Sequence, residues 1–161
     1  MVKVGVISDT HIPNAAAALP GAVARVFKGV DLILHAGDLV RIDVLDELAM
    51  IAPVRAVRGN MDAEPDPLTP DRRIVEVEDL KIGLIHGWGG PNDIHLRVRR
   101  EFDESVRCVV FGHSHKPFNE KVAGALMFNP GSPTDKRFAP YASLGILTVN
   151  GGAVEGEIIK I

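Results

Sequence analysis

The segment Val2-Lys-Val-Gly-Val-Ile-Ser-Asp-Thr-His11 decides the fold that the sequence predicts. Its opening run is short, apolar and rich in β-branched side chains, which is typical of a buried strand. Apolar runs and helical spacings then alternate along the chain. The expected strands and helices, in order, are Val2–Ile7, Pro20–Lys28, Asp31–His35, Asp43–Met50 and Val54–Val57. This strand–helix–strand–helix–strand order favours parallel strands with helices packed outside them.

The second half of the sequence is richer in strands than in helices. Three pairs of short apolar runs are separated by turn residues, and Asn150-Gly-Gly152 joins the last pair with a strong tight-turn signal. The expected hairpins are Arg73–Val77 with Lys81–Ile85, Lys121–Val122 with Leu126–Asn129, and Leu144–Val149 with Val154–Lys160; a helix over Asp93–Glu101 and a strand over Arg107–Phe111 lie between them. The Pro-rich stretch Glu64–Pro70 cannot continue a helix or a central strand, so we expect an exposed connection there. The sum is an α/β architecture with two sheets.

The composition is that of a globular protein, and a length of 161 residues fits one domain. Apolar residues make up 46% and charged residues 24%, and the net charge of −3 argues against general nucleic-acid binding. The apolar start is too short for a signal peptide or a membrane span. The single Cys108 lies in an apolar run, so we expect a buried thiol. We therefore expect a cytoplasmic protein without membrane contact. Nothing in the sequence marks an interface, so a homo-oligomer is neither indicated nor excluded.

Polar side chains that can bind a metal follow five of the expected strands. The candidates are Asp9, His11, Asp38, Asn60, His86, His113 and His115. The carboxyl ends of strands form the ligand crevice in sheets of this type, so these side chains are expected to converge on one rim. A glycine adjoins the polar residue at four of the five ends, namely Gly37, Gly59, Gly87 and Gly112. We expect these glycines to allow sharp turns and a close approach of the backbone to an ion.

Each candidate also has an ordinary structural explanation. Asp9 could cap a turn, Asp38 could cap the helix that follows, and Asn60 could occupy a left-handed turn. His86 could be a hydrogen-bonded core histidine. The same holds for His35, which could instead support Asp38 from behind as the partner of a metal ligand. Together these explanations require five coincidences at equivalent strand ends, so a shared metal site accounts for the pattern better.

The sequence resembles the calcineurin-like metallophosphoesterase superfamily in an ordered series of motifs: Asp9-x-His11, Gly37-Asp38, Gly59-Asn60-x-Asp62, His86-Gly87 and Gly112-His-x-His115. The short chain and the later Asn129-Pro-Gly-Ser132 are similar to its small phosphodiesterase branch in bacteria and archaea. That branch includes the metallophosphoesterase-like subunit of the eukaryotic retromer coat. The resemblance implies an α/β fold, a two-sheet β-sandwich flanked by α-helices, as one domain over residues 1–161. It also places Asn129-Pro-Gly-Ser132 in a tight loop near the site, although a plain turn explains that stretch equally well.

The resemblance implies a role for each candidate ligand. Asp9, His11 and His115 would hold a first metal ion, Asn60, His86 and His113 would hold a second, and Asp38 would bridge both. Asp38, Asn60 and His113 are also the expected catalytic residues. Nitrogen and oxygen ligands without thiolate suit borderline transition metals. We expect two divalent metal ions, Mn²⁺ foremost, with Ni²⁺, Fe²⁺ and Zn²⁺ compatible.

The constellation predicts a dinuclear metal-dependent phosphodiesterase acting on a small phosphodiester, in which a metal-bound hydroxide attacks the phosphorus. Two divalent ions, two carboxylates and a hydroxide leave one net positive charge, which a diester neutralises and a monoester dianion exceeds. Histidine ligands must be neutral to bind metal, so activity is expected to disappear below about pH 6. A phosphomonoesterase or nucleotidase using the same site, and a non-catalytic scaffold of the same fold, are the alternatives.

Two positions depart from the superfamily pattern. Many members carry a histidine after the Gly-Asn pair, thought to protonate the leaving group, where this sequence has Met61. A thioether cannot donate a proton, so we expect a preference for good leaving groups unless another acid such as Asp62 fills the role. Some relatives carry a histidine at the position of Trp88. That indole could form an apolar wall for an aromatic or nucleoside group, or could pack under a loop.

Overall fold

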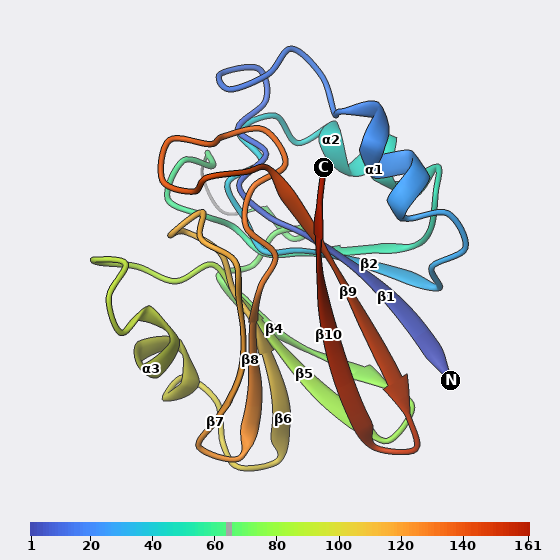
Figure 1. Ribbon diagram of the computed structural model, residues 1–161, viewed down its shortest axis with the longest axis vertical. Coiled ribbons are helices and arrows are strands. Elements are labelled where there is room, and N and C mark those ends of the chain that lie inside the picture. Colours follow the sequence, from blue (N-terminus) through green and yellow to red (C-terminus); the bar gives the residue numbers. More distant parts are fainter. Residues whose placement is uncertain (64–65) are drawn as a thin grey trace.

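The computed structural model describes residues 1–63 and 66–161, so Glu64 and Pro65 of the expected Pro-rich connection lie outside the described residues. The elements of the described chain are β1 (Val2–Ile7), α1 (Gly21–Val26), β2 (Leu32–His35), α2 (Val44–Ala49), β3 (Val54–Ala56), β4 (Arg72–Val77), β5 (Leu80–Ile85), α3 (Ile94–Arg99), β6 (Val106–Val110), β7 (Phe118–Val122), β8 (Ala125–Asn129), β9 (Ser143–Asn150) and β10 (Ala153–Lys160). Two five-stranded sheets contain all of these strands (Figure 1). The predicted α/β fold with two sheets is confirmed.

The first sheet has the strand order β10-β9-β1-β2-β3. Strands β1, β2 and β3 run parallel, as the alternation of strands and helices predicts. The C-terminal hairpin β9–β10 joins this sheet because β9 pairs antiparallel with β1. The first and last strands of the chain are therefore neighbours, a long-range pairing that the local sequence pattern does not indicate.

The second sheet has the order β4-β5-β6-β8-β7. The hairpins β4–β5 and β7–β8 form as predicted. Strands β5, β6 and β8 are parallel to one another, and α3 provides the crossover between β5 and β6. The sheet is thus mixed, and its central parallel strands end at the same edge.

The main core lies between the two sheets. Val4, Leu34, Ile82, Val110 and Phe128 are all fully buried there. Side chains alternate between the two faces of a strand, so Ile33 of β2 points away from this core and packs under α1 and α2 with other buried residues. Helix α3 covers the outer face of the second sheet, and Figure 1 shows it on the side away from α1 and α2. Each fully buried aliphatic side chain contributes roughly 1.5–3 kcal/mol, so these layers stabilise the fold that carries the strand ends.

The element boundaries differ modestly from the prediction. Helix α1 covers Gly21–Val26 within the expected Pro20–Lys28, and β7 begins at Phe118, three residues before the expected start at Lys121. The buried thiol at Cys108 is confirmed. Among the described residues, no helix is long and apolar enough to cross a membrane.

Candidate metal centre

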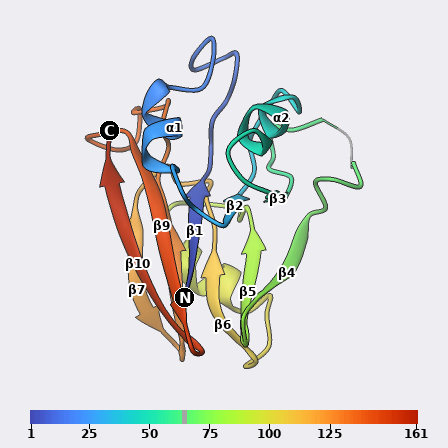
Figure 2. The ribbon, with the colours of Figure 1, turned by 90° about the vertical axis from the view of Figure 1, so that its right-hand side faces the viewer.

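The predicted ligands follow β1, β2, β3, β5 and β6, and in Figure 2 the arrowheads of β1, β5 and β6 point toward the same end of the molecule. Asp9, His11, Asp38, His113 and His115 all have left-handed backbone, with φ between 46° and 67°. This conformation costs roughly 1–2 kcal/mol per non-glycine residue. Such residues persist only where the surrounding structure enforces them, and they cluster at functional sites.

Three buried side chains form one part of the rim. The Nε2 atoms of His115 and His11 lie 3.3 Å and 3.7 Å from Asp9 Oδ1. Asp9 Oδ2 accepts hydrogen bonds from Ser8 Oγ and from the backbone N–H of His113. One carboxylate oxygen is therefore fixed by the protein, and the other faces two imidazole nitrogens.

Asp38 lies between two histidines of the rim. Its Oδ2 is 3.4 Å from His11 Nε2 and 3.3 Å from His86 Nε2, and its Oδ1 accepts the Met61 N–H at 2.8 Å. Asp9 Oδ1 also lies 3.9 Å from His86 Nε2. Both carboxylates thus face both halves of the rim, whereas the sequence interpretation gives that position to Asp38 alone.

The other part of the rim contains Asn60, His86 and His113. His86 Nδ1 donates to the Ala36 carbonyl at 2.7 Å, and His113 Nε2 donates to the Gly89 carbonyl at 3.0 Å. A carbonyl can only accept, so the remaining ring nitrogen of each neutral histidine carries a lone pair. Those nitrogens lie 3.0 Å and 3.1 Å from Asn60 Oδ1. With both rings neutral, these nitrogens and Asn60 Oδ1 are all acceptors, so a proton on a ring or a metal ion between them would relieve the contact.

The carboxylates and imidazoles shift one another's pKa. Burial disfavours protonation of His11, but the negative carboxylates of Asp38 and Asp9, 3.4 Å and 3.7 Å from its Nε2, outweigh it and raise the pKa of His11 to about 9. The pKa of His86 is likewise raised to about 9, against burial, by Asp38 and Asp9. Burial disfavours the charged form of Asp9 and Asp38 too, yet the surrounding histidines hold the pKa of both carboxyls far below the usual range. The cluster therefore stabilises positive charge between its carboxylates.

Unpaired buried atoms show that a cation fits this cluster. Asp9 Oδ1 and His11 Nε2 are buried and have no hydrogen-bond partner within residues 1–63 and 66–161. An unsatisfied buried polar group costs about 1–3 kcal/mol, which a metal ion bound to these atoms would remove. The ligand atoms of Asp9, His11 and His115 lie within 4.8 Å of one another, as do those of Asp9, Asp38 and His86. Imidazole nitrogen with carboxylate oxygen is a donor set of divalent transition metals.

Glycines at the strand ends permit this crowding. A Cβ atom added at Gly59 would lie 2.1 Å from Asp38 Oδ1, and one added at Gly112 would lie 2.0 Å from Ser8 Oγ and 2.6 Å from Asp9 Oδ2. Neither position has space for any side chain. At these two glycines the backbone therefore approaches the side chains of the rim closely, and its approach to an ion stays a prediction.

His35 is a satisfied core histidine. Its Nδ1 accepts the Gly37 N–H at 3.1 Å, so its Nε2 carries the proton and donates to Thr10 Oγ1 at 3.1 Å. Burial lowers the pKa of His35 to about 3 and keeps the ring neutral. Of the two sequence interpretations, the structure favours the core role. The ring supports the backbone just before Asp38 rather than the Asp38 carboxylate itself.

Comparison with known proteins identifies the family. A model of the calcineurin-like phosphoesterase superfamily domain matches residues 2–152. The chain belongs to this superfamily. The resemblance predicted from the motifs is confirmed.

Relatives of this superfamily member match between 81% and 99% of its length. A probable metallophosphoesterase of Methanothermobacter thermautotrophicus is 41% identical over 158 residues, which cover 98% of this chain and 91% of that protein. A phosphodiesterase of Methanocaldococcus jannaschii is 28% identical over 147 residues, covering 81% of this chain and 83% of that protein. The crystal structure of wild-type Vps29 complexed with Zn²⁺ from Entamoeba histolytica is similar with a TM-score of 0.75, at 27% identity and 99% coverage of both chains.

The loop after β8 supports the candidate metal centre from behind. Ser132 Oγ donates to the Asp9 carbonyl at 2.8 Å, and Thr134 Oγ1 donates to the Thr10 carbonyl at 2.7 Å. Asn129 Nδ2 donates to the Gly112 carbonyl at 3.0 Å. The stretch Asn129-Pro-Gly-Ser132 is thus a tight loop beside the site, as expected. Sequence reasoning missed Thr134, although its position just after this loop was a usable signal.

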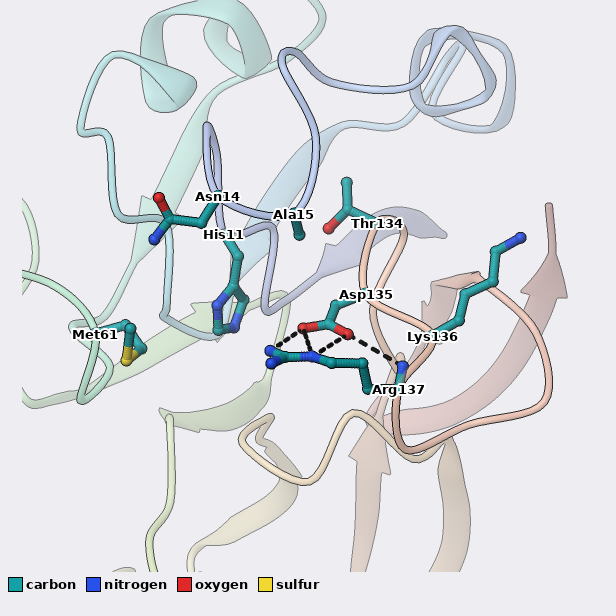
Figure 3. Close-up of a pocket in the computed structure, with 8 residues that line it drawn as sticks. All are labelled: His11, Asn14, Ala15, Met61, Thr134, Asp135, Lys136 and Arg137. Atoms are coloured by element: carbon teal, nitrogen blue, oxygen red, sulfur yellow. Dashed lines mark hydrogen bonds and ion pairs between the residues drawn. The ribbon is translucent and has the colours of Figure 1, made fainter.

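Two cavities adjoin the rim. One, of about 740 Å³, is lined by His11, Asn14, Ala15, Met61 and the loop 134–137 (Figure 3). The other, of about 380 Å³, is lined by Asn60 and His86 together with Trp88, whose side chain is 46% exposed. Trp88 is therefore not packed away under a loop. Its exposure favours the apolar-wall interpretation.

Proposed function

We propose that this chain is a dinuclear metal-dependent phosphodiesterase. Asp9, His11 and His115 would hold one divalent ion, Asn60, His86 and His113 would hold the other, and Asp38 would contact both. The observation that carries the proposal is the position of Asp38 Oδ2, within 3.4 Å of one histidine from each set. A single side chain can serve both sites only from such a position.

The residues of the rim have distinct tasks in this proposal. When bound, two such ions would lower the pKa of water toward 7 and stabilise charge on the phosphoryl group. Asp38 would set the relative position of the two ligand sets, because the Met61 backbone N–H donates to its Oδ1 and leaves Oδ2 facing the histidines. Asn60 and His113 lie at the open edge, where Asn60 is exposed, so they are placed to orient a phosphoryl oxygen. Divalent transition metals suit the donor set, and Mn²⁺ is the first to test.

Charge and relatives support a diester substrate. Asp9 and Asp38 would compensate two of the four charges of a pair of divalent ions, and a hydroxide would compensate a third. A diester monoanion balances the remainder, whereas a monoester dianion exceeds it. One relative, covered over 83% of its length, is named a phosphodiesterase. A small phosphodiester bound at the rim is therefore the proposed substrate.

An assay with paired substrates tests the proposal. The purified protein is analysed for metal content and then assayed with Mn²⁺ on an aryl phosphodiester and on the matching aryl phosphomonoester. We expect two metal ions per chain and a higher kcat/KM for the diester. A higher kcat/KM for the monoester would indicate a phosphomonoesterase instead. No turnover of either substrate with both metal sites filled would contradict the proposal that the chain is an enzyme.

A matched pair of variants tests whether activity depends on the Asp38 carboxylate itself or changes when any carboxylate of the chain is removed. Asp38→Asn should lower kcat/KM by more than the roughly 10–100-fold typical of residues that act behind a metal ligand. Asp79→Asn removes an exposed carboxylate at the opposite end of β5 and should leave the activity unchanged. Equal activities of the two variants would contradict the assignment of Asp38.

A further inference from the structure

A buried carboxylate outside the predicted ligand set faces one of the ligands. The side chain of Asp135 is only 3% exposed, and its Oδ2 lies 3.6 Å from His115 Nδ1. The opposite ring nitrogen, His115 Nε2, faces Asp9 Oδ1 at 3.3 Å. His115 Nδ1 is itself buried and has no hydrogen-bond partner in the described part of the chain. The imidazole thus lies between two carboxylates, one at each nitrogen.

Arg137 holds the Asp135 carboxylate in place. Its Nε donates to both carboxylate oxygens at 2.9 Å and 3.0 Å, and its Nη2 donates to Oδ2 at 2.5 Å. The Arg137 backbone N–H adds a bond to Oδ1 at 3.1 Å. Figure 3 shows the arginine side chain running along the carboxylate at the edge of the larger cavity. Such paired, charge-assisted bonds fix orientation as well as contributing energy.

The same loop is tied to a ligand of the rim. The backbone N–H of Asp135 donates to Ser132 Oγ at 2.9 Å, and that hydroxyl donates to the Asp9 carbonyl at 2.8 Å. Asp135 therefore has a fixed position relative to both Asp9 and His115.

A purely structural ion pair does not account for this geometry. Arg137 is 69% exposed, so an ion pair with it could form entirely at the surface. Burying the acid instead costs desolvation, and a buried ion pair gives little net stability. The burial of this carboxylate is explained if its Oδ2, besides pairing with Arg137, also receives the N–H of His115.

We propose that Asp135 is a positioning residue that orients His115 toward the first metal ion, with Arg137 fixing the carboxylate. This inference rests on the proposed function, because it takes His115 to be a ligand. A carboxylate that accepts the Nδ1 proton selects the tautomer whose Nε2 lone pair faces Asp9 and makes that nitrogen a stronger donor. In the second set, backbone carbonyls accept the ring N–H instead of a carboxylate. Ala36 does so for His86, and Gly89 does so for His113. Asp135 should therefore act on one of the two ions only.

Calorimetric titration of the metal-free protein with Mn²⁺ tests the inference. Asp135→Ala should weaken one of the two binding events by about 10–100-fold, the usual effect of removing the partner of a ligand, and leave the other unchanged. Asp135→Asn keeps an acceptor without its charge and should show a smaller loss. Arg137→Gln keeps the Asp135 carboxylate, so its Mn²⁺ affinity at the weakened site should lie between those of Asp135→Ala and the wild type.

Two backgrounds identify the site that is weakened. In a His113→Ala background, which impairs the second site, Asp135→Ala should still weaken the binding of Mn²⁺ at the remaining first site. With His11→Ala, which impairs the first site, Asp135→Ala should change little. Asp43→Ala is the matched control. Asp43 also pairs with an arginine two residues away, but its carboxylate lies at the surface, whereas that of Asp135 is buried. This control should bind Mn²⁺ like the wild type.

The outcomes separate this inference from the proposed function. Wild-type affinity at both sites in Asp135→Ala and Asp135→Asn would overturn the inference alone, and so would equal weakening of both sites, which indicates a structural role. Circular dichroism of the metal-free variants verifies folding, and the milder Asp135→Asn serves if Asp135→Ala does not fold. A chain that binds two Mn²⁺ ions but hydrolyses no phosphoester would overturn the proposed function and leave the role of Asp135 intact. A wild type that binds no Mn²⁺ would overturn both.

Discussion

In the proposed phosphodiesterase, Met61 takes the position where many superfamily members carry a histidine thought to protonate the leaving group. It lines the larger cavity beside His11 (Figure 3). Met61 is 49% exposed. The neighbouring Asp62 cannot take over that task. Its two oxygens accept the backbone N–H groups of Asp38, Gly59 and Val40 at 2.7–2.9 Å. The described structure thus leaves the position after Asn60 without a side chain that can donate a proton.

We therefore expect the rate on aryl diesters to depend steeply on the pKa of the leaving group. Met61→His should flatten this dependence and accelerate poor leaving groups by up to about 10²-fold, the lower end of what a general acid contributes. A series of substituted aryl diesters measures both slopes. Met61→Leu is the matched control and should keep the steep slope. A flat series for the wild type would show that a different acid acts.

Asp62 connects the loops after β2 and β3. Its charge satisfies three backbone N–H groups, and Asp62→Asn would turn an NH₂ group toward some of them. We expect a loss of about 1–3 kcal/mol in the free energy of unfolding, since a buried donor without an acceptor costs that much. Urea unfolding of the metal-free protein measures the loss. Asp103→Asn, whose partner Ser105 lies in an exposed turn, should change stability less; an equal loss in both variants would contradict the role of Asp62.

At the scale of elements, α3 supports the second ligand set through one arginine. Arg97 donates to the backbone carbonyls of Trp88, Gly90 and Asn92 and so fixes the loop after β5. The same loop provides the Gly89 carbonyl that accepts the proton of His113. The helix thus reaches the rim through the backbone of a loop.

Arg97→Gln should weaken the Mn²⁺ site that contains His113 and leave the other site largely unchanged. The expected loss is about tenfold, the lower end of the range for residues behind a ligand, because the contact is indirect. Titration of the metal-free variant measures it. Arg100→Gln, at an exposed position just after α3, is the control. Weakening of the site that contains His115 instead would contradict this connection.

The strand ends were predictable because each carries its own local signal. Strands β1, β2, β3, β5 and β6 are apolar runs, and a polar residue follows each of them. A glycine adjoins that polar residue after every one of these strands except β1. Parallel strands bring such ends together at one edge of a sheet. The pairing of β9 with β1 was not predictable in this way. An apolar run looks the same whichever sheet it joins, and residues 2–6 pair with residues 145–149 at the far end of the sequence. The position of Asp135 depends on that closure, since its loop connects β8 of the second sheet to β9 of the first.

At the scale of the whole molecule, the metal-free fold holds two carboxylates and several imidazoles inside one rim, and protons can supply the positive charge there. The pKa of His11 and of His86 is raised from 6.5 to about 9. A histidine whose pKa is higher in the folded state stabilises the fold fully below the unfolded value of 6.5. That stabilisation disappears as the pH rises through about 9. The carboxylates, with lowered pKa values, contribute unchanged stability across this window.

The free energy of unfolding of the metal-free protein should therefore fall between pH 6.5 and pH 9, by an amount on the order of 3 kcal/mol for one such histidine. With saturating Mn²⁺ the trend should reverse, because the metal displaces these protons and binds more tightly as they leave. Urea unfolding at pH 6.5 and 8.5, with a chelator and with Mn²⁺, measures both trends. His86→Gln should flatten the metal-free trend, since one of the two shifted groups is gone. A metal-free stability independent of pH in this window would mean that the carboxylates do not hold protons on these histidines, and the electrostatic basis for cation binding at the rim would fail.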